Sequence, residues 1–502
     1  MKNNYTALKS GTDIRGVASD VFGRQVTLTD QAVKDITAAF VKWLSDKTQK
    51  PATQLKVAVG HDSRITAQAI KKGVIETLCA FSVKVYDCGM SSTPAMFMTT
   101  VDTDADGAVQ ITASHHPADR NGLKFFISQG GLDSSDINQI VSDAGTIDIP
   151  ATLGGEVKKL DFMQTYSKRL REIICNELGV AQTDMPLKNF HIVVDAGNGV
   201  GGFYATEVLE KLGARVDGSL FLDPDGMFPN HIPNPEDKAA MKSICDAVKN
   251  SGADLGVIFD TDVDRAGCVD SSGTEINRNR LIALSAAIVI ENNPGATIVT
   301  DSVTSDGLRE FIEQRLSGKH HRFKRGYKNV INEAIRLCDE GINSPLAIET
   351  SGHAALRENY FLDDGAYLIT KIIIKMVKLK QSGSSLEKLT AELKTPVEAE
   401  EIRFDIETEN FKQYGNRVIY ELEQFAGKNE CYTVADDNHE GIRVSTGQGW
   451  FLLRLSVHDP IMPFNVESSV VGGVQTILKQ LKPFFEGCEF LDITPLLEKI
   501  KK

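Results

Sequence analysis

Short apolar runs that end in polar or glycine-containing loops recur along the chain. These runs lie at 55–59, 109–111, 190–194, 255–259, 296–300 and 345–348. Between several of them the apolar residues take helical spacing, and these segments lie at 31–45, 66–81, 162–178 and 330–340. A strand, a polar loop, a helix and another strand in this order are typical of a parallel sheet in an α/β domain.

This rhythm occurs three times and changes from about residue 392. Gly145, Pro150 and Gly154-Gly155 mark a first boundary, and further rounds begin near 190 and near 277. After 392 the pattern predicts strands near 397–404, 444 and 451–457, with helices near 410–426 and 466–484. We therefore expect three related α/β domains and a smaller α+β domain. Their predicted bounds are 1–155, 156–275, 276–391 and 392–502.

Composition and charge restrict the class of protein. The 502 residues can form several hydrophobic cores, and a net charge of −13 disfavours general nucleic-acid binding. Eight scattered cysteines without a CxxC pair indicate structural thiols in a reducing compartment. The first residues lack the apolar core of a signal peptide, and the most apolar run, 281–290, is too short to span a bilayer. We expect a soluble cytoplasmic protein without membrane or nucleic-acid partners.

The first candidate for chemistry is Ser114, within Ala108-Val-Gln-Ile-Thr-Ala-Ser-His-His-Pro117. Functional loops of parallel sheets follow the carboxyl ends of strands, and Ser114 comes just after such a run. A serine at that place can be presented to a substrate. Most loop serines are solvated or cap a helix, so this signal needs a second one.

The second signal is Phe259-Asp-Thr-Asp-Val-Asp-Arg265, which places three carboxylates at alternate positions. On an extended segment alternate residues share a face, so the three groups converge and raise each other's pKa. A divalent cation relieves this repulsion, and oxygen ligands without Cys or His favour Mg²⁺. The alternative is a solvated acidic turn. A metal beside an exposed serine and several Arg and Lys side chains suggests phosphoryl transfer.

Two further loops have no chemistry assigned from their residues alone. Val194-Asp-Ala-Gly-Asn-Gly199 opens a glycine-rich turn after an apolar run, which indicates close packing of the backbone. It lacks GxGxxG spacing, so we predict no dinucleotide site. A proline-rich loop follows at 228–236.

Together these stretches resemble the α-D-phosphohexomutase superfamily, which includes phosphoglucomutases and phosphomannomutases. Thr112-Ala-Ser-His-His-Pro117 is similar to its phosphoserine loop, Asp260-Thr-Asp-Val-Asp-Arg265 to its metal loop and Glu349-Thr-Ser-Gly-His353 to its sugar-specificity loop. Other matching stretches, in the family's order, begin at Gly11, Gly60, Asn121, Val194 and Phe228. The resemblance implies three α/β domains with mixed sheets and a C-terminal α+β lid domain around a central cleft.

The resemblance also implies a mechanism. Ser114 would be phosphorylated in the resting enzyme and, with Asp260, Asp262 and Asp264, would hold Mg²⁺. The phosphoryl group would pass to a sugar monophosphate and interconvert its 1- and 6-phosphates through a bisphosphosugar, with hexose 1,6-bisphosphate as activator. Lys124 is the expected general acid and base.

The remaining site residues are also carried over by position. Arg15, Arg64 and Arg265 would stabilise charge on the transferred phosphoryl group, whereas His115 and His116 are expected to pack within the serine loop. The residues expected to contact the sugar or its phosphate are Glu349, Ser351, Lys328, Arg454 and Ser456.

One segment departs from the family pattern. The family carries Arg-x-Ser-(Gly/Asn)-Thr-Glu-Pro, which grips the non-reacting phosphate, and usually another Arg just beyond. This chain has Arg454-Leu-Ser-Val-His-Asp-Pro460, with Pro463 where the second Arg is expected. Hydrogen bonds to phosphate are lost unless Arg443 or His458 replaces them.

The sequence leaves several alternatives open. Glucose and mannose phosphates are the leading substrates, and a phosphoglucosamine mutase has a similar sugar loop. The altered phosphate segment motivates a non-catalytic sugar-phosphate-binding or regulatory relative. A phosphatase with Asp260 as nucleophile is a third hypothesis. We expect a monomer or a homodimer with small sugar phosphates as partners.

Overall fold

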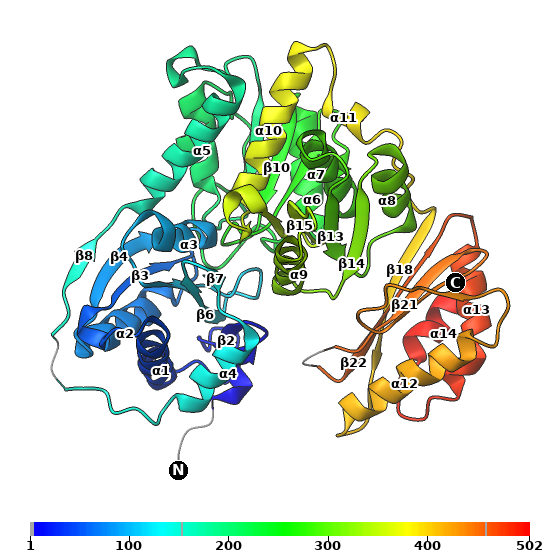
Figure 1. Ribbon diagram of the computed structural model, residues 1–502, viewed down its shortest axis with the longest axis horizontal. Coiled ribbons are helices and arrows are strands. Elements are labelled where there is room, and N and C mark those ends of the chain that lie inside the picture. Colours follow the sequence, from blue (N-terminus) through cyan, green and yellow to red (C-terminus); the bar gives the residue numbers. More distant parts are fainter. Residues whose placement is uncertain (1–4, 152–153, 457–458, 502) are drawn as a thin grey trace. The chain divides into compact units, whose positions relative to one another are not determined.

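The computed structural model describes residues 5–151, 154–456 and 459–501. The chain divides into two compact units, whose helices and strands are labelled in Figure 1. The first unit contains Met1–Leu281 and Ser351–Leu389, and the second contains Ile282–Thr350 and Thr390–Lys502. The chain therefore leaves the first unit, returns to it and ends in the second.

The first sheet is mixed, as predicted. Its strands are β1 (Lys9–Ser10), β2 (Asp13–Val17), β3 (Lys56–His61), β4 (Lys84–Met90), β5 (Gly107–Ile111), β6 (Arg120–Ile127), β7 (Gly130–Gly131) and β8 (Val157–Lys159). They lie in the order β1-β2-β6-β5-β3-β4-β8, and β7 pairs with β6. The strand β3 runs parallel to both neighbours, whereas β6 pairs antiparallel with β2, β5 and β7.

Four helices accompany this sheet: α1 (Asp30–Thr48), α2 (Ala67–Ala80), α3 (Thr93–Asp102) and α4 (Ser134–Asp143). The helix predicted at 31–45 is α1, which begins after Thr29, whose side chain accepts from the Ala32 N–H. Its apolar residues Ile36 and Phe40 pack in one core with Val57 and Val109 of the strands. Each such fully buried side chain contributes roughly 1.5–3 kcal/mol, which fixes the sheet that presents the Ser114 loop.

The second sheet carries the acidic loop. Its strands are β9 (Ile192–Asp195), β10 (Leu255–Phe259), β11 (Ala266–Asp270) and β12 (Glu275–Ile276), in the order β12-β11-β10-β9. Only the β9–β10 pair is parallel. Helix α6 (Lys238–Ser251) packs on β9, β10 and β11. Because β10 and β11 form an antiparallel pair, the six residues between them make a tight connection at one end of the sheet.

Two helices far apart in the sequence pack together in the first unit. These are α5 (Phe162–Leu178) and α10 (Gly365–Gln381), and α10 also contacts β11 and the first strand of the hairpin β16 (Ala354–Leu356)–β17 (Leu362–Asp363). The short helix α11 (Leu386–Leu389) ends this part of the chain. Helix α7 (Arg278–Asn292) contains the residue at which the chain passes from the first unit to the second.

The second unit begins with a parallel sheet. Its strands β14 (Lys319–Phe323), β13 (Thr297–Asp301) and β15 (Leu346–Ile348) lie in that order. Helix α9 (Tyr327–Asp339) packs on β13 and β15, and α8 (Asp306–Glu310) follows the end of β13. The basic loop at 325–328 leads directly into α9.

The C-terminal part has the predicted sheet-and-helix composition. Its strands are β18 (Glu398–Asp405), β19 (Thr433–Val434), β20 (Ile442–Ser445), β21 (Gly449–Leu453) and β22 (Ile461–Ser468). The order β18-β22-β21-β20-β19 is antiparallel throughout. Helices α12 (Phe411–Ala426), α13 (Gly473–Glu486) and α14 (Thr494–Lys501) lie along one face of this sheet (Figure 1).

The helix predicted over 466–484 is wrong at its start. Residues up to Ser468 belong to β22, and α13 begins at Gly473. Alternate residues of β22, Met462, Phe464 and Val466, enter the C-terminal core, so the period of two decides the structure there. A positive φ of 77° at Gly472 then ends the connection and starts the helix.

Two observations concern the cysteines and the length and apolar character of the helices. All eight cysteines lie in the described part of the chain, and none of them forms a disulfide bond. Within 5–151, 154–456 and 459–501, no helix combines the length and the apolar character needed to cross a membrane.

Candidate active site

Ser114 lies in a turn after β5, with the left-handed φ of 51° and 3% of its surface exposed. Its N–H donates to Thr112 Oγ1 at 2.9 Å, and the Thr112 hydroxyl donates to Asp62 Oδ2 at 2.7 Å. The Ser114 hydroxyl donates to Asp260 Oδ2 at 2.9 Å. Arg265 Nη2 donates to the same Ser114 oxygen at 3.0 Å. The predicted serine therefore faces a carboxylate and a guanidinium from the other sheet.

Arg64 supports the backbone of this turn. Its Nη1 donates to the carbonyls of Pro117 at 2.7 Å and Arg120 at 2.8 Å. Its Nη2 donates to the carbonyls of His116 at 2.5 Å and of Ser114. The sequence predicts that Arg64 stabilises phosphoryl charge, but both terminal nitrogens donate to four carbonyls of the serine turn. Its contacts favour holding the turn over touching a ligand.

The three aspartates converge, as predicted, but through a turn rather than an extended segment. Asp260, Asp262 and Asp264 are buried, and one oxygen of each lies within 4.8 Å of the others. Val263 has a positive φ of 68°, which bends the chain so that the carboxylates meet. Burial and the charges of the two neighbouring aspartates raise the pKa of Asp260 well above its usual value.

This cluster fits a hard divalent cation. Asp262 Oδ1 and Asp264 Oδ1 are buried and have no hydrogen-bond partner among the residues that the structure describes. Oxygen donors alone are the ligands that Mg²⁺ takes in proteins, and a cation neutralises buried charges of one sign. The Ser114 hydroxyl lies beside this group through its bond to Asp260.

Lys124 joins the acidic cluster from β6. Its buried ammonium donates to Asp262 Oδ2 at 3.0 Å and to Asp264 Oδ2 at 2.5 Å. Although burial opposes the charge, this ammonium helps to hold the pKa of Asp264 far below its usual value. The sequence prediction that Lys124 belongs to the same site as Ser114 thus agrees with the placement of its side chain.

Arg265 is the hub of the site. Its Nε donates to Asp260 Oδ2 at 3.1 Å, its Nη1 to Asn234 Oδ1 at 3.1 Å and its Nη2 to Ser114 Oγ and to His115 Nδ1 at 2.5 Å. Burial, followed by the charge of Arg265, keeps the pKa of His115 far below its usual value, so a neutral imidazole accepts this bond. His115 also stacks on His116 with ring centres 5.1 Å apart, in keeping with a packing role for both.

Arg15 lies on β2, which pairs with the strand that carries Lys124. Its Nη2 donates to Asp13 Oδ2 at 2.7 Å, and its backbone is opposite Gly122. A Cβ at Gly122 would lie 2.2 Å from the Ile14 carbonyl, so glycine is required for this close pairing. After burial, the charge of Arg15 contributes to lowering the pKa of His115 and His116 in the serine turn.

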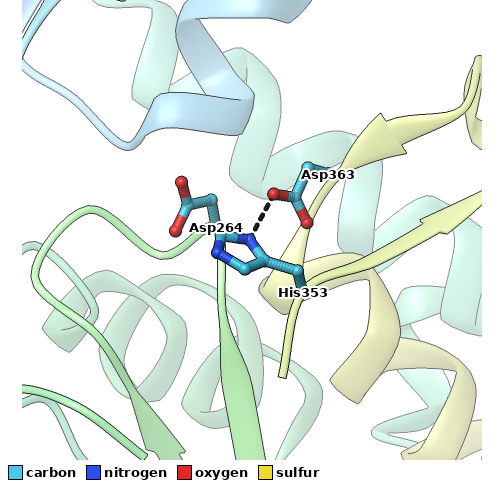
Figure 2. A group of neighbouring side chains, drawn as sticks. All are labelled: Asp264, His353 and Asp363. Atoms are coloured by element: carbon cyan, nitrogen blue, oxygen red, sulfur yellow. Dashed lines mark hydrogen bonds and ion pairs between the residues drawn. The ribbon is translucent and has the colours of Figure 1, made fainter. Parts of the chain in front are cut away.

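The structure adds two residues that the sequence did not single out. Figure 2 shows the imidazole of His353 between the carboxyl groups of Asp363 and Asp264. His353 Nδ1 makes a short hydrogen bond to Asp363, and although burial opposes it, Asp363 and Asp264 raise the pKa of His353 to about 9. A visible signal was the pair of acids in Phe361-Leu-Asp-Asp-Gly365, ten residues after the histidine of a recognised motif.

The expected sugar-binding residues divide between the units. Ser351 is buried in the first unit, whereas Glu349 is buried in the second and accepts the Gly326 N–H at 2.5 Å. Lys328 lies in the first turn of α9. The bond from Gly326 connects the basic loop to the motif that carries Glu349.

The segment that departs from the family pattern, residues 454–460, follows β21 in the second unit. Arg454 Nε is buried and has no hydrogen-bond partner among the described residues, and burial lowers the pKa of this guanidinium. The Ser456 N–H donates to the Ile461 carbonyl at 3.0 Å, and the Ser456 hydroxyl accepts the Asp459 N–H at 3.2 Å. Val457 and His458 lie outside the described residues, so the structure does not test compensation by His458.

Arg443 is held away from a compensating role. Its Nη1 donates to the Ser302 carbonyl at 3.1 Å and its Nη2 to Asp306 Oδ1 at 2.9 Å. Its guanidinium also lies 3.5 Å from the centre of the Trp450 ring. These contacts already engage both terminal nitrogens and one face of the guanidinium.

Comparison with known proteins places this site in a family. Three models, described as alpha/beta/alpha domains I, II and III of phosphoglucomutase/phosphomannomutase, match residues 8–148, 164–273 and 277–396. A phosphomannomutase/phosphoglucomutase of Pseudomonas aeruginosa is 30% identical over 478 residues, 95% of this chain and 94% of that protein. A phosphoglucomutase of Neisseria meningitidis is 29% identical over 483 residues, 95% of this chain and 96% of that protein.

A solved structure agrees with these matches. The crystal structure of a phosphoglucomutase/phosphomannomutase family protein from Burkholderia thailandensis matches with a TM-score of 0.78 at 25% identity. It covers 97% of this chain and 98% of that one. The motifs, the mixed sheets, the site and the relatives agree, and the chain belongs to the phosphoglucomutase/phosphomannomutase family.

Proposed function

We propose that this chain is a phosphohexomutase that interconverts the 1-phosphate and the 6-phosphate of glucose, mannose or both. The observation that carries the proposal is the environment of Ser114. Its hydroxyl donates to Asp260 at 2.9 Å and accepts from Arg265 at 3.0 Å, beside the three-aspartate cluster. Such a serine is suited to carry a phosphoryl group, because a carboxylate can take its proton and a cation faces its oxygen.

The proposed cycle begins with a phosphoryl group on Ser114. A free hydroxyl of the sugar monophosphate attacks phosphorus, the bond from phosphorus to Ser114 Oγ breaks, and a hexose 1,6-bisphosphate forms. After this intermediate turns over, Ser114 Oγ attacks its other phosphate and the isomeric monophosphate leaves. Free hexose 1,6-bisphosphate is the proposed activator because it can phosphorylate an unmodified Ser114.

The basic residues have separate proposed tasks. Arg265 contacts Ser114 Oγ and is best placed to stabilise charge on the transferred group, with Arg15 as a second cation. Arg64 supports the same step through the carbonyls of the serine turn. Lys124 is the proposed general acid and base: its neutral amine takes the proton of the attacking hydroxyl, and its ammonium form gives a proton to the oxygen that leaves phosphorus.

Asp260, Asp262 and Asp264, with an oxygen on phosphorylated Ser114, are the proposed ligands of Mg²⁺. The support is the set of oxygen donors and the two buried carboxylate oxygens without hydrogen-bond partners in the described chain. When bound, the cation would neutralise charge on the phosphate. Asp260 in addition accepts the hydrogen bond of the Ser114 hydroxyl while that hydroxyl is unmodified.

Recognition of the sugar phosphate is assigned by motif position. We propose that Glu349 and Ser351 bind sugar hydroxyls, and that Lys328, Arg454 and Ser456 contact the sugar or its non-reacting phosphate. We also keep the four-domain division at 1–155, 156–275, 276–391 and 392–502 as a proposal. We further propose that the protein is cytoplasmic, that it is a monomer or a homodimer, and that it has no nucleic-acid partner.

A coupled assay tests this function. Glucose 1-phosphate, mannose 1-phosphate and glucosamine 1-phosphate are offered in parallel with Mg²⁺ and trace glucose 1,6-bisphosphate, with Ser114→Ala as the control. We expect turnover of glucose or mannose phosphate that depends on Ser114. Preference for the glucosamine compound would instead assign a phosphoglucosamine mutase.

Two other outcomes would replace the proposal. Absence of turnover with all three sugars, together with calorimetric binding of one of them, would indicate a non-catalytic sugar-phosphate-binding protein. Release of inorganic phosphate with an acid-labile phosphoryl group on the protein would indicate a phosphatase that uses Asp260. An acid-stable phosphoserine at position 114 supports the mutase.

A further inference from the structure

The glycine-rich turn after β9 and the proline-rich loop at 228–236 pack directly on each other. Gly197 has a φ of 52°, and a Cβ there would lie 2.9 Å from Pro233 Cβ and 3.2 Å from His231 Cε1. Any side chain at this position would push the proline-rich loop away. The two motifs to which sequence reasoning gave no chemistry therefore form one structural element.

A buried ion pair joins the two loops. His231 Nε2 lies 3.0 Å from both carboxylate oxygens of Asp195, and its Nδ1 lies 2.9 Å from the Ile232 carbonyl. Both ring nitrogens face acceptors, so the imidazole donates from both and is protonated. The pKa of His231 is raised accordingly, since the bond and charge of Asp195 outweigh burial. Asp195 also accepts the Gly197 N–H at 2.9 Å.

The same loop aims an amide oxygen at the active site. The Asn234 N–H donates to the Ile232 carbonyl at 2.8 Å, so this carbonyl connects Asn234 to the His231 side chain. Asn234 Oδ1 accepts the Glu236 N–H at 3.0 Å and Arg265 Nη1 at 3.1 Å. The amide oxygen is therefore fixed by its own loop before it meets the guanidinium.

The orientation of Arg265 depends on where its nitrogens are held. Nε is bound by Asp260 and Nη2 by Ser114 and His115, all of which take part in or adjoin the proposed reaction. Asn234 is the partner of Nη1. It lies outside the three motifs to which the proposed reaction is assigned. A planar guanidinium with a fixed Nη1 directs its Nη2 toward Ser114 without rearrangement.

We propose that Asn234, held by the Asp195–His231 pair, is a positioning residue that orients Arg265 toward the phosphoryl group on Ser114. Its kinetic consequence rests on the mutase function proposed above. Asn234 acts through Arg265 and does not touch the reacting atoms. Its loss should lower the rate of phosphoryl transfer and leave sugar-phosphate binding unchanged.

The kinetic test uses three variants of the full-length protein. Asn234→Leu removes the acceptor at similar size, and we expect kcat to fall about 10- to 100-fold with KM within about twofold, as for the loss of one hydrogen bond to a charged group. Asn234→Asp keeps an acceptor oxygen and should restore kcat to within about threefold of the wild type. Asn230→Ala is the matched control, because Asn230 bonds Asn198 in the same loop pair and kcat should stay near the wild-type value.

A spectroscopic test does not depend on turnover. In protein labelled with ¹⁵N-arginine, the Arg265 side-chain signals are assigned by their loss in Arg265→Lys. A held Nη1 gives slowly exchanging N–H signals, which should disappear in Asn234→Leu and persist in Asn234→Asp and Asn230→Ala.

The outcomes separate the two proposals. If the wild type turns over and Asn234→Leu keeps full kcat, the positioning role is wrong and the mutase function stands. A rise in the KM of Asn234→Leu by the same factor as the fall in its kcat would also overturn the positioning role. If the wild type does not turn over any sugar phosphate, the mutase function is wrong and the arginine signals decide the positioning role. Their persistence in Asn234→Leu would overturn it.

Discussion

The loops that carry Ser114 and the three aspartates differ from the segment around Arg454 in how their polar side chains are held. In the first unit Ser114, Lys124 and Arg265 each bond to groups far away in the sequence. In the second unit Ser456 bonds to Asp459 and Ile461, which lie close to it in the sequence. Arg443, the candidate replacement for a missing donor, is engaged by Asp306 and Ser302.

If the proposed function holds, the difference predicts that phosphoryl transfer and phosphate recognition are separable in this chain. The first region keeps every motif residue expected for phosphoryl transfer, whereas the second keeps Arg454, Ser456 and Pro460 but has Val457 and His458 in place of motif residues. Substitutions in the first region should therefore act on kcat, and substitutions in the second on KM.

Ser114→Ala is expected to have the largest effect. Without the Ser114 oxygen no phosphoryl group can be held between the two half-reactions, so turnover should fall at least about 10⁴-fold. The coupled assay measures this, and intact mass reports the loss of the phosphate. Ser45→Ala, at a hydroxyl that donates to the Lys50 carbonyl, is the control and should have no effect. Turnover retained in Ser114→Ala would show that the first region does not carry the phosphoryl transfer.

Asp262→Asn should have the next largest effect. It removes one proposed metal ligand and one partner of Lys124, and turnover at saturating Mg²⁺ should fall about 10²- to 10³-fold. Mg²⁺ at about 100 times its Kd should stabilise the wild-type fold by about 2.7 kcal/mol and the variant by much less. Melting curves with and without Mg²⁺ check this.

The half-buried Asp246, paired with Lys242 on α6, gives the control for the metal prediction. Asp246→Asn should respond to Mg²⁺ like the wild type. Equal stabilisation of wild type and Asp262→Asn by Mg²⁺ would show that the cation binds elsewhere. Full turnover after Mg²⁺ has been removed by a chelator would show that the reaction does not need the metal.

Periodicity sufficed for the elements that carry the chemistry, and contacts between distant segments did not follow from it. The apolar runs at 109–111 and 255–259 predicted β5 and β10, because buried strands between helices are almost uniformly apolar. The convergence of the three aspartates was predicted correctly, but on an extended segment rather than on a turn. The turn depends on a positive φ at Val263, and a β-branched residue gives no sign in the sequence that it adopts this conformation.

The partners of single side chains were the least predictable part. A lone Arg64 gives no sign that its nitrogens meet carbonyls 50 or more positions away. His353 and Asp363 come together only because β16 and β17 pair as a hairpin. The boundary between β22 and α13 was missed for a related reason, because a strand and a helix that are both apolar on one face read alike until the turn is placed.

One acidic side chain in each region extends the comparison to the dependence of stability on pH, where the expected effect is smaller. Lys124 helps to keep Asp264 charged, whereas burial raises the pKa of Glu467 in the second unit to about 7. A carboxyl whose pKa is higher in the folded state binds more protons when folded, so its stabilisation is complete below about pH 4.5 and is lost as pH rises to about 7. The loss is at most about 3 kcal/mol in the free energy of unfolding.

Urea unfolding between pH 4.5 and 8 measures this effect of Glu467. Glu467→Gln keeps an acceptor for the Trp450 Nε1–H, which donates to Glu467 at 3.0 Å, and should flatten the decline in stability. Glu421→Gln, at an exposed position of α12, should leave the decline unchanged. A decline of the same size in Glu467→Gln would show that another group titrates.

The smallest expected effect tests the departing segment itself. The double substitution Val457→Asn and His458→Thr restores the hydrogen-bonding side chains of the family motif between Ser456 and Pro460. A new bond to a charged phosphate is worth at least about 1.5 kcal/mol, so we expect KM to fall about tenfold with kcat within twofold. Val471→Asn, at a highly exposed valine of the same domain, controls for added polarity and should not change KM. An unchanged KM in the double variant would mean that the native segment already grips the phosphate with Arg454 and Ser456 alone. The two regions would then be equally complete, and the separation between chemistry and recognition would fail at its second region.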